Sequence, residues 1–377
     1  MEGNQTRLKV MTIFGTRPEA VKMAPVVLEL QKHPDRIETI VTVTAQHREM
    51  LDQVLGVFDI TPNYDLEIMQ QGQTLFDITT KALTGLDGVM KEAKPDLVLV
   101  HGDTTTTFVA SLAAFYNQIP VGHVEAGLRT YNKYSPYPEE MNRQLTGVMA
   151  DLHFAPTEWA AANLKKENKP DNTIFITGNT AVDALKTTVK ESYIHPILEK
   201  LSPDQRLILV TAHRRENIGE PMRQMFRAIR RVVDENPEVV AIYPVHPNPL
   251  VRQLAEEGLG DHDRIHLIPP LELLDFHNVM SRATLILTDS GGIQEEAPYF
   301  GVPILVLRDT TERPEGVQAG TSILVGTHEE DVYNEAQTLL RNEKRYSEMA
   351  RAVNPYGDGN ASERIVRHIF TYFNNKG

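Results

Sequence analysis

The sequence predicts an α/β protein with two domains, each a parallel sheet covered by helices. Short apolar runs rich in Val, Ile and Leu alternate with longer segments of helical period, which is typical of βαβ units with right-handed crossovers. A similar set of runs occurs in each half, and 377 residues suffice for two domains of ordinary size. The pattern therefore favours two Rossmann-like domains in tandem.

Twelve strands are expected, six in each half of the chain. In the first half they cover Lys9–Phe14, Thr39–Val43, Leu97–Val100, Val121–Val124, Leu152–Phe154 and Ile174–Ile176. In the second half they cover Leu207–Thr211, Val239–Tyr243, Ile265–Leu267, Leu285–Leu287, Ile304–Val306 and Ile323–Val325.

The expected domains are residues 1–180 and 181–360, linked through Asn179–Asp204. This linker should contain a helix, with breaks at His195-Pro196 and Ser202-Pro203. Residues 361–377 form the third expected segment, in which Ala361–Phe373 has a helical period. That terminal helix could pack back on the N-terminal domain.

Composition excludes several kinds of protein. The formal net charge is −13 and no basic face is evident, so we expect no nucleic-acid binding. The absence of cysteine excludes disulfides, thiolate metal sites and cysteine nucleophiles. Met1–Lys9 is polar and no apolar run approaches the length of about 20 residues that spans a membrane. A cytoplasmic protein without membrane insertion is therefore expected.

Polar residues that directly follow strands are the candidate site residues, because open α/β sheets bind ligands beyond the carboxyl ends of their strands. Arg17 follows the first strand at a helix start, and Lys22 lies about one turn further on. Two such cations suit an anion such as a diphosphate. The alternative is a solvated helix start.

Three carboxylates also follow strands or begin helices. Asp103 follows the Leu97–Val100 strand and could instead cap the next helix. Glu125 follows the Val121–Val124 strand, where a structural ion pair with Arg129 is the alternative. Glu139 comes after Pro138, and a carboxylate there also suits an ordinary first helical turn. Carboxylates in these places favour proton transfer or recognition of sugar hydroxyl groups.

The second half carries histidines and arginines in equivalent places. His213 follows the Leu207–Thr211 strand and His246 follows the Val239–Tyr243 strand. A single such histidine is more often structural, but two at equivalent positions weaken that interpretation. Arg308 and Arg313 follow the Ile304–Val306 strand and favour an anion. Phe276 could lean its ring against a base, although core packing explains it equally well.

The turn Ser290-Gly291-Gly292 joins a buried strand to a helix start. Glycine lets a ligand approach the backbone closely, and helix N-termini bind phosphate. Glu296 lies one helical turn later and suits a ribose diol; a plain turn with a surface Glu is the alternative. The chain has no HExxH, GxxxxGK[ST] or GxGxxG motif, so we expect no metal and no nicotinamide cofactor.

Six segments, taken together, resemble a known family. They are Phe14–Glu19, His101–Thr104, His123–Arg129, Pro138–Arg143, Thr211–Asn217 and Thr288–Glu296. They occur in the family's order along nearly the full chain, which is similar to the bacterial non-hydrolysing UDP-N-acetylglucosamine 2-epimerases. The resemblance implies a fold like that of the GT-B glycosyltransferases, with the active site in the interdomain cleft and UDP held by the C-terminal domain.

The activity implied by the resemblance is reversible conversion of UDP-GlcNAc to UDP-ManNAc, which supplies ManNAc for cell-surface polysaccharides. UDP leaves by anti elimination to give 2-acetamidoglucal and then adds back, with neither NAD nor a metal. Carried over by position, Asp103, Glu125 and Glu139 are the acid/base candidates, and His213 assists the diphosphate or its protonation. The implied UDP contacts are Arg17, Lys22 and Arg313 at the diphosphate, Ser290, Gly291 and Gly292 at phosphate oxygens, Glu296 at the ribose, and Phe276 with the backbone of Leu271 at the uracil.

Homodimerisation and a second UDP-GlcNAc that acts as an activator are further implications of the resemblance. Gln46 and His47 match the activator positions, but Gly72 stands where members with this site carry an arginine just before Gln73-Thr74-Leu75. Three rival functions stay open: a GT-B glycosyltransferase, a hydrolysing 2-epimerase that releases UDP and free ManNAc, and a non-catalytic UDP-sugar sensor. The three carboxylates speak against the sensor.

Overall fold

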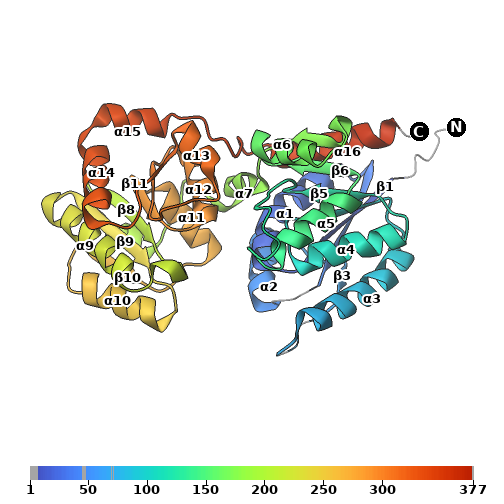
Figure 1. Ribbon diagram of the computed structural model, residues 1–377, viewed down its shortest axis with the longest axis horizontal. Helices are drawn as coiled ribbons and strands as arrows, with labels where there is room; N and C mark the ends of the chain where they lie inside the picture. The colour runs from blue at the N-terminus through green and yellow to red at the C-terminus, as the bar shows by residue number, and fades with distance from the viewer. Residues whose placement is uncertain (1–6, 45–47, 69, 71, 376–377) are drawn as a thin grey trace. The chain divides into compact units, whose positions relative to one another are not determined.

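The computed structural model describes residues 7–44, 48–68, 70 and 72–375 of the chain. The chain folds into two compact units (Figure 1). The first comprises Met1–Ala184 together with Gly357–Gly377, and the second comprises Leu185–Tyr356. Each unit is a parallel sheet with helices on both faces, and each is described here by itself.

The sheet of the first unit has seven parallel strands in the order β3-β2-β1-β4-β5-β6-β7. The strands are β1 (Leu8–Phe14), β2 (Ile37–Val43), β3 (Tyr64–Asp65), β4 (Leu97–His101), β5 (Val121–Val124), β6 (Leu152–Ala155) and β7 (Ile174–Ile176). The helices are α1 (Arg17–Gln31), α2 (Arg48–Val57), α3 (Leu75–Ala93), α4 (Thr105–Tyr116), α5 (Glu139–Met149), α6 (Glu158–Lys166), η1 (Asp171–Thr173) and α16 (Ala361–Asn374). Helix α7 (Thr180–Thr188) begins in this unit and ends in the second.

Helix α3 illustrates how the sequence places a helix on this sheet. Its apolar residues recur at intervals of four, at Ile78, Ala82, Leu86 and Met90, and all four are buried. This stripe packs in one cluster with alternate residues of β1 and β4, namely Met11, Ile13, Val98 and Val100. The order of the strands reverses between β1 and β4, where the connection crosses the sheet. Such a switch point is a common ligand site in α/β sheets.

The sheet of the second unit has six parallel strands in the order β10-β9-β8-β11-β12-β13. The strands are β8 (Arg206–Thr211), β9 (Val239–Pro244), β10 (Ile265–Ile268), β11 (Leu285–Thr288), β12 (Ile304–Val306) and β13 (Ser322–Leu324). The helices are α8 (Pro196–Glu199), η2 (Arg215–Asn217), α9 (Glu220–Glu235), α10 (Pro249–Leu259), α11 (Leu273–Ser281), α12 (Gly291–Glu296), η3 (Ala297–Phe300), α13 (Pro314–Ala319), α14 (Glu329–Arg341) and α15 (Glu343–Ala350).

Alternate residues of one strand enter different cores in the second unit. Ile208 and Val210 of β8 pack with residues of α9, α10 and α14, whereas Leu207 and Leu209 pack with residues of α11 and α12 on the other face. Because strand side chains point to opposite faces in turn, a strand covered on both faces is apolar throughout. This explains the continuous apolar runs seen in the sequence.

The C-terminal helix α16 belongs to the first unit and packs against α1. Its N-terminus is tied down by Asp183, whose carboxylate accepts hydrogen bonds from the Ala361 and Ser362 N–H groups at 3.1 and 2.7 Å. Arg364 adds an ion pair with Asp358 and a hydrogen bond to the Thr177 carbonyl. Residues that lie far apart in the sequence thus close one unit.

The predicted fold class is confirmed, since both sheets are parallel and helices alternate with strands. Each of the twelve expected strands is present. Strand β3 was not among the expected strands; it has only two residues and pairs with the end of β2. A two-residue strand with one polar member is too short to show any apolar period. No helix in the described part of the chain combines the length and the apolar character that a membrane crossing requires.

Candidate active site

Unit 1 collects three predicted acidic residues around the ends of two adjacent strands. Asp103 follows β4 by two residues and Glu125 follows β5 directly, while Glu139 is the first residue of α5. β4 and β5 pair with His101 opposite Val124, so their carboxyl ends are level. The charges of Glu125 and Glu139 both act on Asp103. The structure therefore brings these three carboxylates into one electrostatic site.

Glu125 is held in an uncommon backbone conformation, with φ of 63°. Few non-glycine residues adopt this left-handed region, and those that do cluster at functional sites. Its carboxylate accepts hydrogen bonds from Lys22 Nζ and from Asn179 Nδ2, the latter at 3.1 Å. Lys22 was predicted to contact a diphosphate. In the structure its ammonium group is paired with the Glu125 carboxylate.

The alternative ion pair between Glu125 and Arg129 is wrong. The buried Arg129 guanidinium instead forms a forked pair with Glu167, with Nε–Oε1 and Nη2–Oε2 distances of 2.6 and 2.9 Å. A two-pronged pair of this kind uses the full geometry of guanidinium and carboxylate. Arg129 therefore anchors its loop to the end of α6, and the Glu125 carboxylate does not depend on it.

Asp103 does not cap α4, so that alternative is also wrong. The N-cap residue is Thr104, whose hydroxyl accepts a hydrogen bond from the Thr107 N–H at 3.1 Å. The Asp103 carboxylate is paired with Arg143, at 2.6 Å between Oδ2 and Nη2. Burial raises the pKa of Asp103 to about 6; Arg143 opposes the rise, and Glu125 and Glu139 add to it. A carboxyl group that titrates near neutral pH suits proton transfer.

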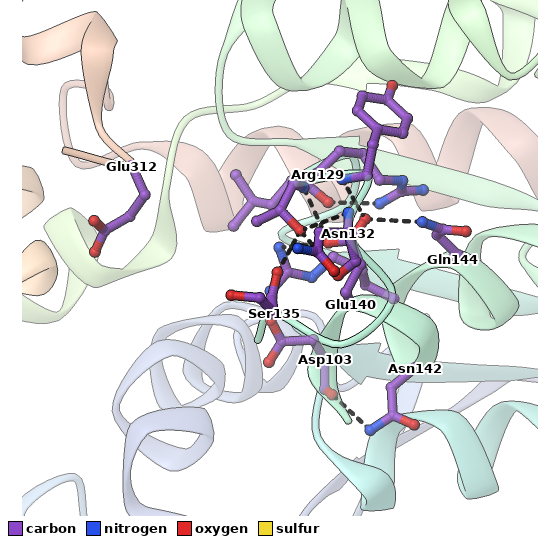
Figure 2. A network of polar contacts seen from close by, with 12 residues as sticks. Asp103, Arg129, Asn132, Ser135, Glu140, Asn142, Gln144 and Glu312 are labelled. Carbon is purple, nitrogen blue, oxygen red and sulfur yellow. Dashed lines mark hydrogen bonds and ion pairs between the residues drawn. The ribbon is translucent and has the colours of Figure 1, made fainter. Parts of the chain in front are cut away.

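Glu139 and Glu140 are adjacent in sequence and differ completely in environment. Glu140 is fully buried and accepts hydrogen bonds from the Thr130 and Tyr131 N–H groups, both at 3.0 Å, and from Gln144 at 2.8 Å (Figure 2). Glu139 is partly exposed, and its carboxylate makes no hydrogen bond or ion pair within the described residues. Of the two, Glu139 has the carboxylate that is available to a ligand, and Glu140 has a structural role.

Glu19 is a buried carboxylate that the sequence analysis did not single out. It is 2% exposed. Its Oε2 accepts hydrogen bonds from the Gly15 and Thr16 N–H groups and the Thr16 hydroxyl, and Oε1 accepts from Thr104 and Thr107. Burial raises the pKa of Glu19, which hydrogen bonds from Thr104, Gly15 and Thr16 oppose. The Thr16-x-x-Glu19 spacing, typical of a capping box, was the available signal.

Three buried histidines lie on the neighbouring strands β4, β5 and β6: His101, His123 and His153. Burial lowers their pKa values to about 4, 3 and 4. The His123 Nε2 donates to the Gly102 carbonyl at 2.7 Å. His101 Nε2 lies 3.6 Å from the Glu125 carboxylate. These rings are neutral at pH 7, so His101 does not act as a second cation beside Lys22 at the Glu125 carboxylate.

In unit 2, His213 lies just after β8 and is positioned by Asp289 after β11. The buried Asp289 carboxylate accepts hydrogen bonds from the backbone N–H groups of His213 and Arg214, both at 2.8 Å. Its Oδ1 also lies 3.2 Å from the ring Nδ1 of His213. Burial works to raise the pKa of Asp289, but the bonds from His213 and Arg214 leave it below its usual value. An acidic residue after a buried strand was the available signal for Asp289.

The two histidines at equivalent strand ends lie together. The His213 and His246 rings stack at a centroid distance of 5.3 Å, with 11° between their planes. Burial and the neighbouring His213 lower the pKa of His246. This stacking supports the interpretation that both histidines face one site.

The glycine turn joins β11 to α12 as expected, with Ser290 as the N-cap residue. Gly292 is exposed, and a Cβ on it would meet nothing within 4 Å. Gly291 is buried, and a Cβ there would come within 2.8 Å of Glu312 Oε1. The turn therefore leaves the start of α12 open beside Gly292, which the phosphate assignment requires.

The arginines near this turn are paired with carboxylates. Arg313 Nε lies 2.5 Å from Glu295 Oε1, and that glutamate is 2% exposed. Arg308 and Arg214 both contact Glu312, at 2.5 and 3.0 Å. Arg214 and Arg308 follow β8 and β12, so Glu312 holds both guanidinium groups near the ends of these two strands.

The remaining predicted nucleotide contacts lie around α11 and α12. Phe276 and Leu271 are partly buried and pack on the same apolar cluster. Glu296 ends α12, and its Oε2 lies 3.6 Å from Nε2 of the buried His277. Arg17 is the first residue of α1 and makes no hydrogen bond or ion pair within the described residues. Gln46 and His47 lie outside the described residues.

Nowhere in the described part of the chain do three or more His, Asp or Glu side chains cluster so that they could bind a metal ion. The candidate site residues are carboxylates, histidines, lysine and arginines. Each of these groups acts as a proton donor, a proton acceptor or an electrostatic partner of an anion.

Comparison with known proteins identifies the family. The family model described as UDP-N-acetylglucosamine 2-epimerase matches residues 28–370. The chain belongs to the UDP-N-acetylglucosamine 2-epimerase family. A curated UDP-N-acetylglucosamine 2-epimerase of Bacillus subtilis is 63% identical over 367 residues, covering 97% of this chain and 96% of the relative.

Solved structures of the epimerase family share the fold over nearly the whole chain. S. aureus MnaA, solved with UDP, is 56% identical with a TM-score of 0.87, and 97% of each chain is covered. The UDP-GlcNAc 2-epimerase from Neisseria meningitidis, solved with UDP-GlcNAc, is 51% identical with a TM-score of 0.85, covering 97% of this chain and all of that one. Membership in an epimerase family favours catalysis over the sensor alternative.

Proposed function

We propose that this protein interconverts UDP-GlcNAc and UDP-ManNAc by inverting C2, without hydrolysis. The observation that carries the proposal is the carboxylate group of unit 1. Asp103, Glu125 and Glu139 share one electrostatic site, and burial raises the pKa of Asp103 to about 6. The relatives named above support the substrate class.

The chemistry explains why several carboxylates are useful. C2–H is not next to a carbonyl group and is therefore a weak acid. In the proposed first half-reaction the C1–O bond to UDP breaks and UDP leaves with the electron pair. The C2 proton passes to a carboxylate, and a C1=C2 double bond forms in 2-acetamidoglucal. UDP then adds back to C1 while a proton reaches C2 from the other face. Proton removal and delivery on opposite faces require more than one acid/base group.

We propose that unit 2 holds the UDP part of the substrate. Ser290, Gly291 and Gly292 would bind phosphate oxygens at the open start of α12, and Glu296 would accept hydrogen bonds from the ribose. Phe276 and the backbone of Leu271 would contact the uracil. His213, oriented by Asp289, would donate to the departing diphosphate, with Arg313 and Arg17 as further cations. Lys22, paired with Glu125, would act chiefly on that carboxylate. The product, UDP-ManNAc, would supply ManNAc for cell-surface polysaccharides.

Proton NMR of the purified protein with UDP-GlcNAc in D₂O, without added metal or NAD, tests the proposal. We expect UDP-ManNAc to appear with deuterium at C2, because the group that delivers the proton on the other face takes it from the solvent. UDP with free ManNAc would instead identify a hydrolysing 2-epimerase. Unchanged UDP-GlcNAc despite UDP binding would favour a glycosyltransferase that lacks its acceptor, and would reject the proposal.

We also propose that the protein works as a homodimer, joined through the face formed by α3, α4 and α5. Helix α4 packs against both α3 and α5. Each of these helices exposes large apolar side chains: Phe76 at 84% near the start of α3, Phe115 at 60% and Tyr116 at 67% at the end of α4, and Val148 at 71% near the end of α5. Large apolar side chains exposed on neighbouring helices favour association through these helices.

Replacing Phe115 by Lys should therefore convert the dimer to a monomer, because a charge buried at an interface without a partner is costly. Multi-angle light scattering gives the mass directly, with a monomer mass of 42.4 kDa for comparison. Trp159→Lys on α6, where the Trp is 50% exposed, is the matched control and should leave the mass unchanged. A wild-type protein of monomer mass would reject the dimer.

A further inference from the structure

Two adjacent residues of helix α5, Asn142 and Arg143, contact Asp103. Arg143 Nη2 lies 2.6 Å from Asp103 Oδ2, and Asn142 Nδ2 donates to the Asp103 carbonyl at 3.0 Å (Figure 2). Arg143 is 11% exposed, so the ion pair is largely shielded from water. An aspartate whose backbone carbonyl and carboxylate are both bound can adopt few side-chain orientations. Its other oxygen, Oδ1, accepts no hydrogen bond from the described residues and remains available for a proton.

Arg143 also forms an ion pair with a second carboxylate, that of Glu140. Arg143 Nη1 lies 3.5 Å from Glu140 Oε2, and Glu140 is fully buried. Burial works to raise the pKa of Glu140, but hydrogen bonds from Thr130, Gln144 and Tyr131 outweigh it and leave the pKa below its usual value. Glu140 therefore stays ionised and keeps the Arg143 guanidinium between two carboxylates.

We propose that Arg143 is a positioning residue, which aims Asp103 at the reacting carbon and keeps it ionised, with Glu140 holding Arg143 in place. The inference rests on the proposed function, because it assigns Arg143 a part in the proton transfer at C2. Arg143 does not itself touch the substrate in this scheme. It acts through Asp103, so its loss should change the acid/base behaviour of Asp103 more than the binding of UDP.

The charges around Asp103 give the direction of the effect. Arg143 and Lys22 are cations that favour the ionised carboxylate, and Glu125 and Glu139 are anions that oppose it, as does burial. Arg143 is the larger of the two cationic contributions. Without Arg143, burial and both anions remain, so the pKa of Asp103 should rise above about 6. Less of the ionised form would then exist at neutral pH.

Carbon-13 NMR of the side-chain carboxyl groups measures this titration without any reference to turnover. The Asp103 resonance is assigned by its loss in Asp103→Asn. In Arg143→Gln we expect its midpoint to move up by about one pH unit or more. Arg367→Gln is the matched control, since Arg367 is an exposed arginine of the same unit that pairs with Glu363 on α16. That control should leave the Asp103 midpoint unchanged. An unmoved midpoint in Arg143→Gln overturns the proposal.

Kinetics then separate positioning from substrate binding. Arg143→Gln should move the acid limb of the kcat/KM profile upward with the NMR midpoint, while the Kd for UDP stays within about twofold. Arg143→Lys retains the charge but cannot fork between two carboxylates. It should leave the midpoint close to wild type and still lower kcat about 10- to 100-fold through misorientation. Wild-type kcat in Arg143→Lys would overturn the orienting role.

Two safeguards keep the outcomes distinct. If Arg143→Gln does not fold, Arg143→Lys carries the test: a lowered kcat with an unchanged Kd for UDP supports the proposal, and wild-type kcat overturns it. If the wild-type protein does not epimerise UDP-GlcNAc but the Asp103 midpoint moves in Arg143→Gln, the proposed function fails while the link between Arg143 and Asp103 stands.

Discussion

Replacing Glu139 by Gln is expected to lower kcat for UDP-GlcNAc epimerisation by about 10²–10⁴-fold, the usual range for a general acid or base. The amide has the size of the carboxyl group but neither accepts nor returns a proton at neutral pH. Glu139 makes no hydrogen bond or ion pair within the described residues, so its replacement should leave the melting temperature and the Kd for UDP nearly unchanged. Turnover assays, calorimetric melting and UDP titration measure the three quantities. A kcat within threefold of wild type would remove Glu139 from the proton transfer.

The adjacent Glu140→Gln is the matched comparison for stability, which it should lower and which Glu139→Gln should leave nearly unchanged. Glu140 Oε1 and Oε2 each accept a backbone N–H group, from Tyr131 and Thr130. A Gln side chain has one oxygen, so its NH₂ group must face one of these N–H donors and leave it without a partner. An unsatisfied buried donor costs about 1–3 kcal/mol. We therefore expect a lower free energy of unfolding. Equal effects of the two variants on stability would contradict the division of roles.

Replacing Glu19 by Ala should lower the free energy of unfolding by about 3–5 kcal/mol, because several buried hydrogen-bond donors lose their acceptor at about 1–3 kcal/mol each. The Glu19 carboxylate accepts the Gly15 and Thr16 N–H groups and reaches the Thr104 and Thr107 hydroxyls, which ties the loop after β1 to the start of α4. Alanine leaves these donors unsatisfied and opens a cavity. Denaturant unfolding measures the loss.

Glu19→Gln distinguishes the hydrogen bonds from the charge. Its oxygen can accept the two N–H groups that Oε2 now accepts. Its NH₂ group then meets hydroxyls, which can rotate and accept instead of donate. The cost should therefore stay within about 1 kcal/mol. A loss as large as that in Glu19→Ala would show that the negative charge, and not the hydrogen bonding, stabilises this junction.

The sequence was sufficient for the fold because the relevant forces are local and periodic. β8 has apolar residues on both faces, so its run is continuous, and α3 repeats its apolar residues at intervals of four. β3 could not be predicted from the sequence, because a strand of two residues shows no apolar period. The place of Asp103 and Glu125 at the carboxyl edge of the sheet was also predictable, since both come within two residues of a strand end.

Pairing of charged groups could not be predicted in the same way. Glu125 and Arg129 are four residues apart, yet Glu125 pairs with Lys22 and Arg129 with Glu167. Glu125 has a positive φ, and which partner a charge finds depends on where the chain brings distant segments together. For the same reason the sequence pattern could not distinguish Glu139 from Glu140 or identify Thr104, rather than Asp103, as the cap of α4.

The sequence by itself determined the α/β class, the parallel strands, the family and the residue types of the site, because these follow from periodicity and from motifs in a given order. Only the tertiary structure decided which carboxylates are accessible to a ligand and which are buried and hydrogen-bonded to the protein itself. It buried Glu19 and Glu140 among hydrogen-bond donors and set Asp103 against Arg143. Solvation and charge pairing depend on neighbours that are distant in the chain, and they decide whether a carboxylate serves stability or chemistry.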